Sequence, residues 1–144
     1  MDITNKLILT DVDGVLLNWL YGFHRWVTDR HGLEIALQNE YDLGKLYGVE
    51  KGFMKELVKV FNESAHIEYL PPMGSAIKYV RKLHEEHGFV FHAITSITTD
   101  VYAARLRVRN LETLFGKGVF EQVECIGTGD DKDAALEKYR DSGC

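Results

Sequence analysis

The chain has 144 residues and a formal net charge of −5, with 17 Lys and Arg against 22 Asp and Glu. Its length suits one domain that buries its own core. The acidic balance, with no long basic block, excludes the electrostatic footprint of a nucleic-acid-binding protein. The two cysteines, Cys125 and Cys144, form neither a disulfide framework nor a zinc pattern, which favours a reducing, cytoplasmic location. No apolar run approaches the roughly 20 residues of a membrane span, so no membrane partner is expected.

Short apolar runs rich in β-branched or aromatic residues predict three strands. They lie at 6–12, 89–97 and 122–127, and their continuity is typical of strands covered on both faces. Apolar stripes at helical spacing predict helices between and after them. These helices are expected around 19–27 with Gly32 as the stop, 53–61, 75–87 with Gly88 as the stop, 101–115, and from about 131 onward.

Strands that alternate with helices predict an α/β fold with a parallel sheet and right-handed crossovers. The connection between the first two strands is far longer than such a crossover needs. We therefore expect residues 17–72 to form a helical insertion, closed by the stiff return LPPMG, and residues 1–16 and 73–144 to form the α/β core. In such sheets, ligands collect beyond the carboxyl ends of the strands.

Polar side chains stand at the predicted exits of all three strands. Asp11 and Asp13 follow the first strand, Thr95 lies near the end of the second, and Lys132 comes shortly after the third. Gly14 permits a sharp bend, so the two carboxylates need not crowd each other. Lys132 lies in the first turn of a predicted helix, where a positive charge is unfavourable beside the positive end of the helix dipole. A bound phosphate would reverse that penalty. We expect the four side chains to converge on one pocket.

In their order and spacing, these residues resemble the haloacid-dehalogenase-like (HAD) hydrolase superfamily. DVDGV is similar to its first motif, HAITS to its second and GDDKDAAL to its third, and the match covers nearly the whole chain. The resemblance implies a three-layer Rossmann-like core with a small helical cap inserted after the first strand. It also implies a Mg²⁺-dependent phosphomonoester hydrolase that forms an aspartyl-phosphate on a small phosphorylated substrate.

Each residue of the pattern has a chemical role in that reaction. A carboxylate is a competent nucleophile toward phosphorus once the phosphate charge is offset, and Asp11 takes this role. Asp13 is expected to act as acid toward the leaving alkoxide and then as base toward water. Thr95, or in second place Ser96, would donate a hydrogen bond to a phosphoryl oxygen, and Lys132 would neutralise transition-state charge. By resemblance, Mg²⁺ is held by the Asp11 side chain and the Asp13 backbone carbonyl.

The predicted insertion resembles the small cap of deoxyribonucleotidase-like members, where the cap selects the leaving group. Aromatic faces in the cap could stack on a base, so nucleoside monophosphates or similar small phosphates are the expected substrates. The cap residues singled out are Trp19, Phe23, Tyr41 and Tyr47. The alternative is that aromatic residues at helical spacing form the core of the cap.

The superfamily's fourth motif, one or two acids after a further strand, is not found between Lys132 and Cys144. We therefore expect the last core strand to be missing from this chain, which leaves the first strand as an open edge. GTGDDKD could instead be the fourth motif, with Asp130 and Asp131 as metal ligands, but that leaves no third-motif lysine. A catalytically impaired HAD-fold binding or scaffold protein is the alternative function.

Other patterns are assigned no site. HEEHG at 84–88 places its histidines in the last turn of a helix, where they suit the dipole. Arg105, Arg107 and Arg109 are expected to form a solvated helix edge. The inward face of that helix is expected to carry Val101, Ala104, Val108, Leu111 and Phe115. A receiver domain is disfavoured, because 50–62 reads as a helix where such a domain needs a middle strand.

Overall fold

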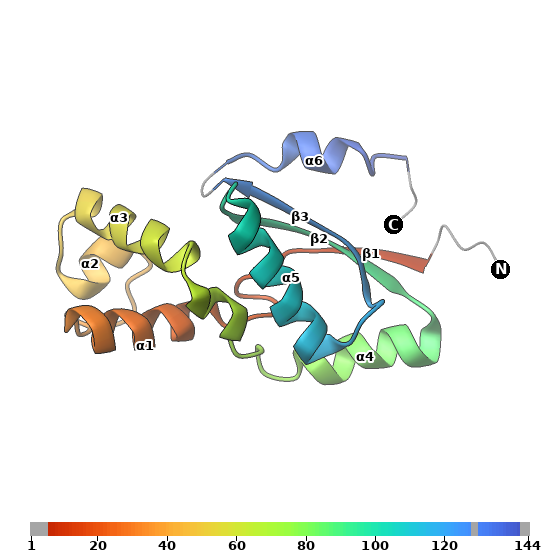
Figure 1. Cartoon of the computed structure of the whole chain (residues 1–144), viewed down its shortest axis with the longest axis horizontal. Coiled ribbons are helices and arrows are strands. Elements are labelled where there is room, and N and C mark those ends of the chain that lie inside the picture. Colours follow the sequence, from red (N-terminus) through yellow and green to blue (C-terminus); the bar gives the residue numbers. More distant parts are fainter. Residues whose placement is uncertain (1–5, 128–129, 142–144) are drawn as a thin grey trace.

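The computed structural model describes residues 6–127 and 130–141. Strands and helices alternate in the α/β core, and a run of helices separates its first two strands (Figure 1). In chain order the elements are β1 (Leu7–Thr10), α1 (Trp19–His31), α2 (Leu43–Tyr47), α3 (Lys51–Asn62), the 3-10 helix η2 (Ala65–Tyr69), α4 (Ala76–His87), β2 (Val90–Ile97), α5 (Val101–Phe115), β3 (Phe120–Gly127) and α6 (Asp133–Glu137). The predicted α/β class is confirmed. α2 and η2 are additions that the sequence did not predict.

The three strands form one parallel sheet in the order β1-β2-β3. Leu7 pairs with Val90 and Thr95 with Cys125, so all three carboxyl ends lie at one edge of the sheet. The expectation that every strand is covered on both faces holds only for the central strand β2. β1 is half-buried and β3 is partly exposed along its first half, because each has only one neighbouring strand within the described residues.

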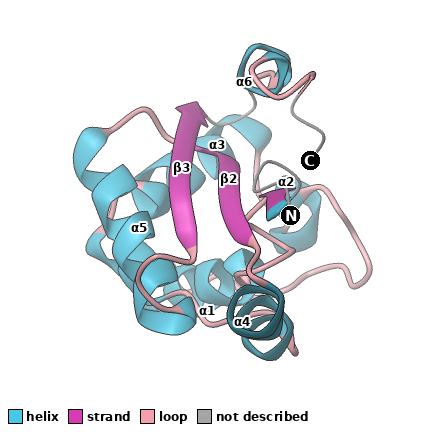
Figure 2. Cartoon of the chain, turned by 90° about the vertical axis from the view of Figure 1, so that its right-hand side faces the viewer, coloured by secondary structure: helices cyan, strands magenta, loops and turns pink. Residues whose placement is uncertain are grey.

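Helices lie on both faces of this sheet. α5 packs on one face, where Phe115 contacts Phe120 and Phe120 contacts Phe91. Because successive strand side chains point to opposite faces, His92 lies on the other face, where it contacts Tyr139 just after α6. Figure 2 shows α5 and α6 on different sides of β2 and β3. The chain therefore has an α/β/α arrangement around a small open sheet.

The segment 17–72 folds back to where it started. Leu17 and Pro72 form an antiparallel bridge, and the Asn18 N–H donates to the Pro71 carbonyl at 2.7 Å. Between these ends, α1, α2 and α3 form a helical layer beside the core, on the left in Figure 1. We refer to α1, α2 and α3 together as the cap. Its interior is largely aromatic, with Trp19 stacked on Phe23 at 4.9 Å between ring centroids and both rings in contact with Phe61.

Helix ends follow the expected chemistry. The Asn18 side chain accepts from the Tyr21 N–H at the start of α1. Gly32 and Gly88 end α1 and α4 in the left-handed conformation, with φ of 65° and 74°. Both glycine stops predicted from the sequence are therefore confirmed, because a residue with a Cβ pays a steric cost at positive φ.

The predicted inward face of α5 is confirmed at Leu111 and Phe115 and is wrong at Val101, while Arg107 was wrongly expected to be solvated. Arg107 is completely buried, whereas Val101 is 61% exposed. The buried face instead runs through Ala103, Arg107 and Leu111, which are spaced four residues apart and so lie on one stripe of the helix. Arg107 was expected on a solvated edge. Its charge is accommodated inside because a carboxylate faces it.

Within the described ranges, none of the helices combines the length and apolarity that a bilayer crossing requires.

Candidate functional site

A tight turn after β1 sets the directions of the two acidic side chains. The Val12 carbonyl accepts from the N–H groups of Leu16 at 2.8 Å and Leu17 at 3.0 Å, while the Gly14 N–H donates to the Leu17 carbonyl at 2.9 Å. Gly14 has φ of 79°, a conformation that a residue with a side chain rarely adopts, and the sharp bend expected at this glycine is present. Val12 is fully buried and anchors the turn, so Asp11 and Asp13 project from a fixed piece of backbone.

Asp11 and Lys132 meet although they are far apart in the sequence. The Lys132 Nζ lies 3.0 Å from Asp11 Oδ1 and also donates to the Ile94 carbonyl at 3.1 Å. Asp11 Oδ1 accepts a further hydrogen bond from the Val12 N–H at 2.7 Å. Among the described residues, both partners of this carboxylate fall on Oδ1. Neither of these contacts engages the second oxygen, Oδ2, and the side chain is 47% exposed.

Asp13 has a partner that the sequence did not indicate. Arg107 holds both of its oxygens, with Nη1 at 2.8 Å from Oδ1 and Nη2 at 3.2 Å from Oδ2. Burial raises the pKa of Asp13 above its ordinary value, and the Arg107 guanidinium opposes that rise. The spacing of Ala103, Arg107 and Leu111 was the signal that could have revealed the buried arginine.

Thr95 and Ser96 lie beside each other on β2 but face opposite sides of the sheet. Thr95 is fully buried, and its hydroxyl has no hydrogen-bond partner within the part of the chain that the structure describes. An unpaired buried hydroxyl costs about 1–3 kcal/mol, so this group is an exception to the usual pairing of buried polar atoms. Ser96 instead donates to the Gly127 carbonyl at 2.8 Å, which ties β2 to β3 at their exits.

The cap residues predicted to select a substrate lie mostly inside the cap. Phe23 is completely buried and Tyr47 is 4% exposed. Trp19 stacks on Phe23, and its Nε1 donates to Asn62 Oδ1 at 2.7 Å. Tyr41, in contrast, is fully exposed. Phe23 packs against Trp19 and Tyr47, as the core alternative expected. A stacking role for any of the four rings stays a prediction.

A cavity of about 300 Å³ lies between α3 and the exits of β2 and β3. From the core, Ile97, Thr98, Thr99 and Gly127 line it, and from α3 the lining includes Lys55, Lys59 and Asn62. Asn62 is buried and its Nδ2 donates to the Ile97 carbonyl at 3.4 Å, so it joins the cap to the sheet beside the cavity. Asn62 is a second residue that the sequence did not single out. Among the described residues, none of the four side chains predicted at the strand exits lines this cavity, which is large enough for a small molecule.

The carboxylates at the strand exits would fit a Mg²⁺ ion only if phosphate oxygens of a substrate completed its coordination. Nowhere in residues 6–127 and 130–141 do three or more His, Cys, Asp or Glu side chains gather as a metal cage. Mg²⁺, however, is often bound by one or two carboxylates together with phosphate oxygens. Asp11 Oδ2 is such a carboxylate oxygen. Asp131 Oδ1 accepts from the Asp133 N–H at 2.9 Å and Asp130 packs on Gly127, while residues 128–129 of the alternative fourth motif lie outside the described residues.

No protein family model matches the chain. A protein of Enterobacteria phage T4 is 30% identical to it over 141 residues, which is 93% of this chain and 49% of that protein. It is described as an uncharacterized 32.4 kDa protein in the Gp30-rIII intergenic region. The chain thus spans about half the length of the relative it matches, and the relative's description states no activity.

Proposed function

We propose that this protein is a Mg²⁺-dependent phosphomonoester hydrolase of the HAD type, with Asp11 as its nucleophile. The contact between Lys132 Nζ and Asp11 Oδ1 at 3.0 Å carries the proposal. It joins the residues that resemble the first and third motifs, from two separate strand exits, at the edge where a parallel sheet collects ligands. The α/β/α arrangement and the returning cap agree with the same layout.

The first chemical step is transfer of the phosphoryl group to the chain. Asp11 Oδ2 attacks phosphorus, the bond from phosphorus to the leaving oxygen breaks, and an acyl phosphate forms on Asp11. Lys132, already within contact of this carboxylate, would offset charge on the phosphoryl oxygens. Thr95 would donate its unpaired hydroxyl to one of them. A bound Mg²⁺ would supply further charge neutralisation at the phosphate.

Asp13 would act first as the general acid and then as the general base. In the first step it would donate a proton to the leaving oxygen, and in the second it would accept one from the water that hydrolyses the acyl phosphate. Burial raises the pKa of Asp13, which brings the carboxyl group closer to the range where it can donate. The bidentate contact with Arg107 fixes its direction and limits that rise.

The substrates proposed are nucleoside monophosphates or similar small phosphates. The cavity beside the strand exits offers apolar walls from Val58 and Ile97 and polar groups from Asn62 and Thr98. Its charged lining is balanced, with the cations Lys55 and Lys59 and the acids Glu56 and Glu63. Such a lining suits a leaving group that is partly apolar and forms hydrogen bonds.

The test is a phosphatase assay on the full-length protein with Mg²⁺ and a panel of small phosphomonoesters. Hydrolysis that is lost in Asp11→Asn supports the proposal. The matched control is Glu85→Gln, which changes a carboxylate to an amide on α4 where the side chain is 58% exposed, and which should keep full activity.

A HAD-fold binding or scaffold protein is the second candidate, and the Asp13 geometry favours it. Both oxygens of this carboxylate are occupied by Arg107, as expected of a structural ion pair. Absence of turnover on every phosphomonoester, together with binding of inorganic phosphate that weakens in Lys132→Met, would select this candidate over the enzyme.

A further inference from the structure

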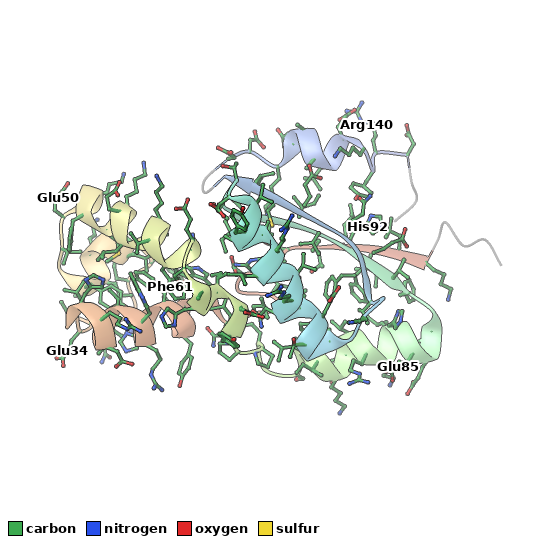
Figure 3. The ribbon with its side chains drawn as sticks, viewed as in Figure 1. Glu34, Glu50, Phe61, Glu85, His92 and Arg140 are labelled. Atoms are coloured by element: carbon green, nitrogen blue, oxygen red, sulfur yellow. The ribbon has the colours of Figure 1, made fainter. Side chains whose placement is uncertain are left out.

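A second cavity of about 310 Å³ lies on the outer side of the cap, between α1 and the segment from η2 to Pro71. It shares no lining residue with the cavity at the strand exits. The end of α3 separates the two, because Phe61 lines the outer cavity and its neighbour Asn62 lines the inner one. Figure 3 shows Phe61 between α3 and α1. We call this cavity the outer groove.

The floor of the outer groove is apolar and closely packed. Phe61 and Leu70 are almost completely buried, and Trp26 is 8% exposed. A methyl group on Gly22 would overlap Leu70 Cδ2, so this glycine allows α1 to approach Leu70 closely. The floor is therefore fixed by core packing rather than by mobile surface side chains.

The walls of the outer groove carry exposed aromatic rings. Tyr21 on α1 is 50% exposed, and Tyr69 at the end of η2 is 76% exposed. The Tyr21 hydroxyl accepts from Arg25 Nη1 at 3.2 Å, which places a guanidinium beside that ring. Exposed tyrosine faces with an adjacent guanidinium form a surface on which planar, π-rich groups stack.

The charges that line the outer groove favour an anion. Among the residues that line the groove, two cations on α1, Arg25 and Arg30, stand against a single acid, Asp29. Asp29 lies 4.0 Å from Arg25 Nε, and both side chains are more than 60% exposed, so this pair is weak. The lining thus carries more positive than negative charge, although the whole chain has a formal charge of −5.

We propose that the outer groove binds a mononucleotide, with its base against Tyr21 or Tyr69 and its phosphate at Arg25 and Arg30. Aromatic faces bind bases through stacking, and arginine matches phosphate geometry through paired N–H groups. The groove's volume limits the ligand to about the size of one nucleotide. This site is separate from Asp11 and does not rest on phosphatase activity.

The experiment is a titration of AMP into the full-length Asp11→Asn variant in Mg²⁺-free buffer with EDTA, so that the probe is not consumed. Calorimetry gives the affinity, and the fluorescence of the two tryptophans, one of which is Trp26 in the floor, gives a second signal. We expect saturable AMP binding with a Kd below about 1 mM, and binding at least about tenfold weaker for adenosine and for inorganic phosphate alone. Both parts of the ligand are then required.

Variants locate the site. Tyr69→Ala and Arg30→Ala should each weaken AMP binding by about tenfold, since one stacked base or one phosphate contact is lost. Both residues are on the surface, so neither change should impair folding. Arg81→Ala on α4, which removes an exposed arginine paired with Glu85, is the matched control and should leave the affinity unchanged.

Four results would overturn the proposal. The first three are absence of saturable AMP binding up to about 5 mM, affinity unchanged in both Tyr69→Ala and Arg30→Ala, and loss of binding in Lys59→Ala, which alters only the inner cavity. The fourth is far tighter binding of a single-stranded oligonucleotide than of AMP, which would make nucleic acid the ligand of the groove.

Discussion

The buried ion pair between Arg107 and Asp13 gives the sharpest stability prediction. Asp13→Ala removes both hydrogen bonds of the Arg107 guanidinium, whose Nε already has no partner within the described residues. Two charge-assisted hydrogen bonds at about 1.5–3 kcal/mol each give a loss of about 3–6 kcal/mol. Breaking a buried pair by removing one partner typically costs about 3–5 kcal/mol, which agrees. We therefore expect Asp13→Ala to lower the free energy of unfolding by about 3–5 kcal/mol.

Replacing the arginine of the pair, in place of the aspartate, should lower the free energy of unfolding by a smaller amount. Arg107→Met leaves Asp13, whose side chain is 26% exposed and can take up a proton. The double variant Asp13→Ala with Arg107→Met should recover part of the loss, because it buries no unpaired charge. Urea unfolding at about pH 7, followed by far-UV circular dichroism, gives the four free energies of a double-mutant cycle. Additive losses in the double variant would refute this account of the pair.

The pH dependence of the Arg107→Met variant has a definite sign. Burial raises the pKa of Asp13 above its ordinary value of 3.8, and loss of Arg107 removes the main effect that opposes it. The folded variant then binds the Asp13 proton more tightly than the unfolded chain does. Its stability relative to wild type therefore rises as the pH falls through the raised pKa, and the gain is complete below 3.8. If the difference in unfolding free energy between Arg107→Met and wild type stays constant from neutral pH to about pH 4, this prediction is wrong.

Further substitutions separate stability from turnover. Thr95→Val removes a buried hydroxyl without a described partner, so unfolding free energy should hold or rise by up to about 1 kcal/mol while phosphatase activity falls at least about tenfold. Lys132→Met should change stability by less than about 1 kcal/mol, because the pair with Asp11 is partly exposed, yet lower turnover by about a hundredfold or more in the phosphatase assay. Gly22→Ala should lower the thermal midpoint, since overpacking against Leu70 at about 1–3 kcal/mol exceeds a helix-propensity gain of about 1 kcal/mol; a stabilised variant would contradict the close approach.

Local chemistry made most of the fold predictable. Apolar runs marked all three strands, and their parallel pairing followed from the helices between them. Glycines that adopt positive φ ended α1 and α4 where expected. The five-residue helix α2 and the 3-10 helix η2 were missed, because elements of one or two turns show too little periodicity to stand out.

The part of the candidate site that lies at the strand exits could be predicted from the sequence. Asp11 and Lys132 meet because parallel strands end at one edge, which topology alone dictates. Arg107 was misplaced because a charged residue is assumed to be solvated unless its partner is known, and the partner, Asp13, lies on a different element. A buried ion pair between distant segments is a property of tertiary packing that no single helix reveals.

Trapping the proposed intermediate tests the central claim most directly. The full-length protein is incubated with Mg²⁺ and a phosphomonoester, quenched, treated with borohydride and mapped by peptide mass spectrometry. Borohydride reduces an acyl phosphate on aspartate to homoserine, so the account predicts homoserine at position 11, absent without substrate and absent from Asp11→Asn. Release of phosphate with Asp11 unmodified, or homoserine at another position, would contradict Asp11 as the nucleophile.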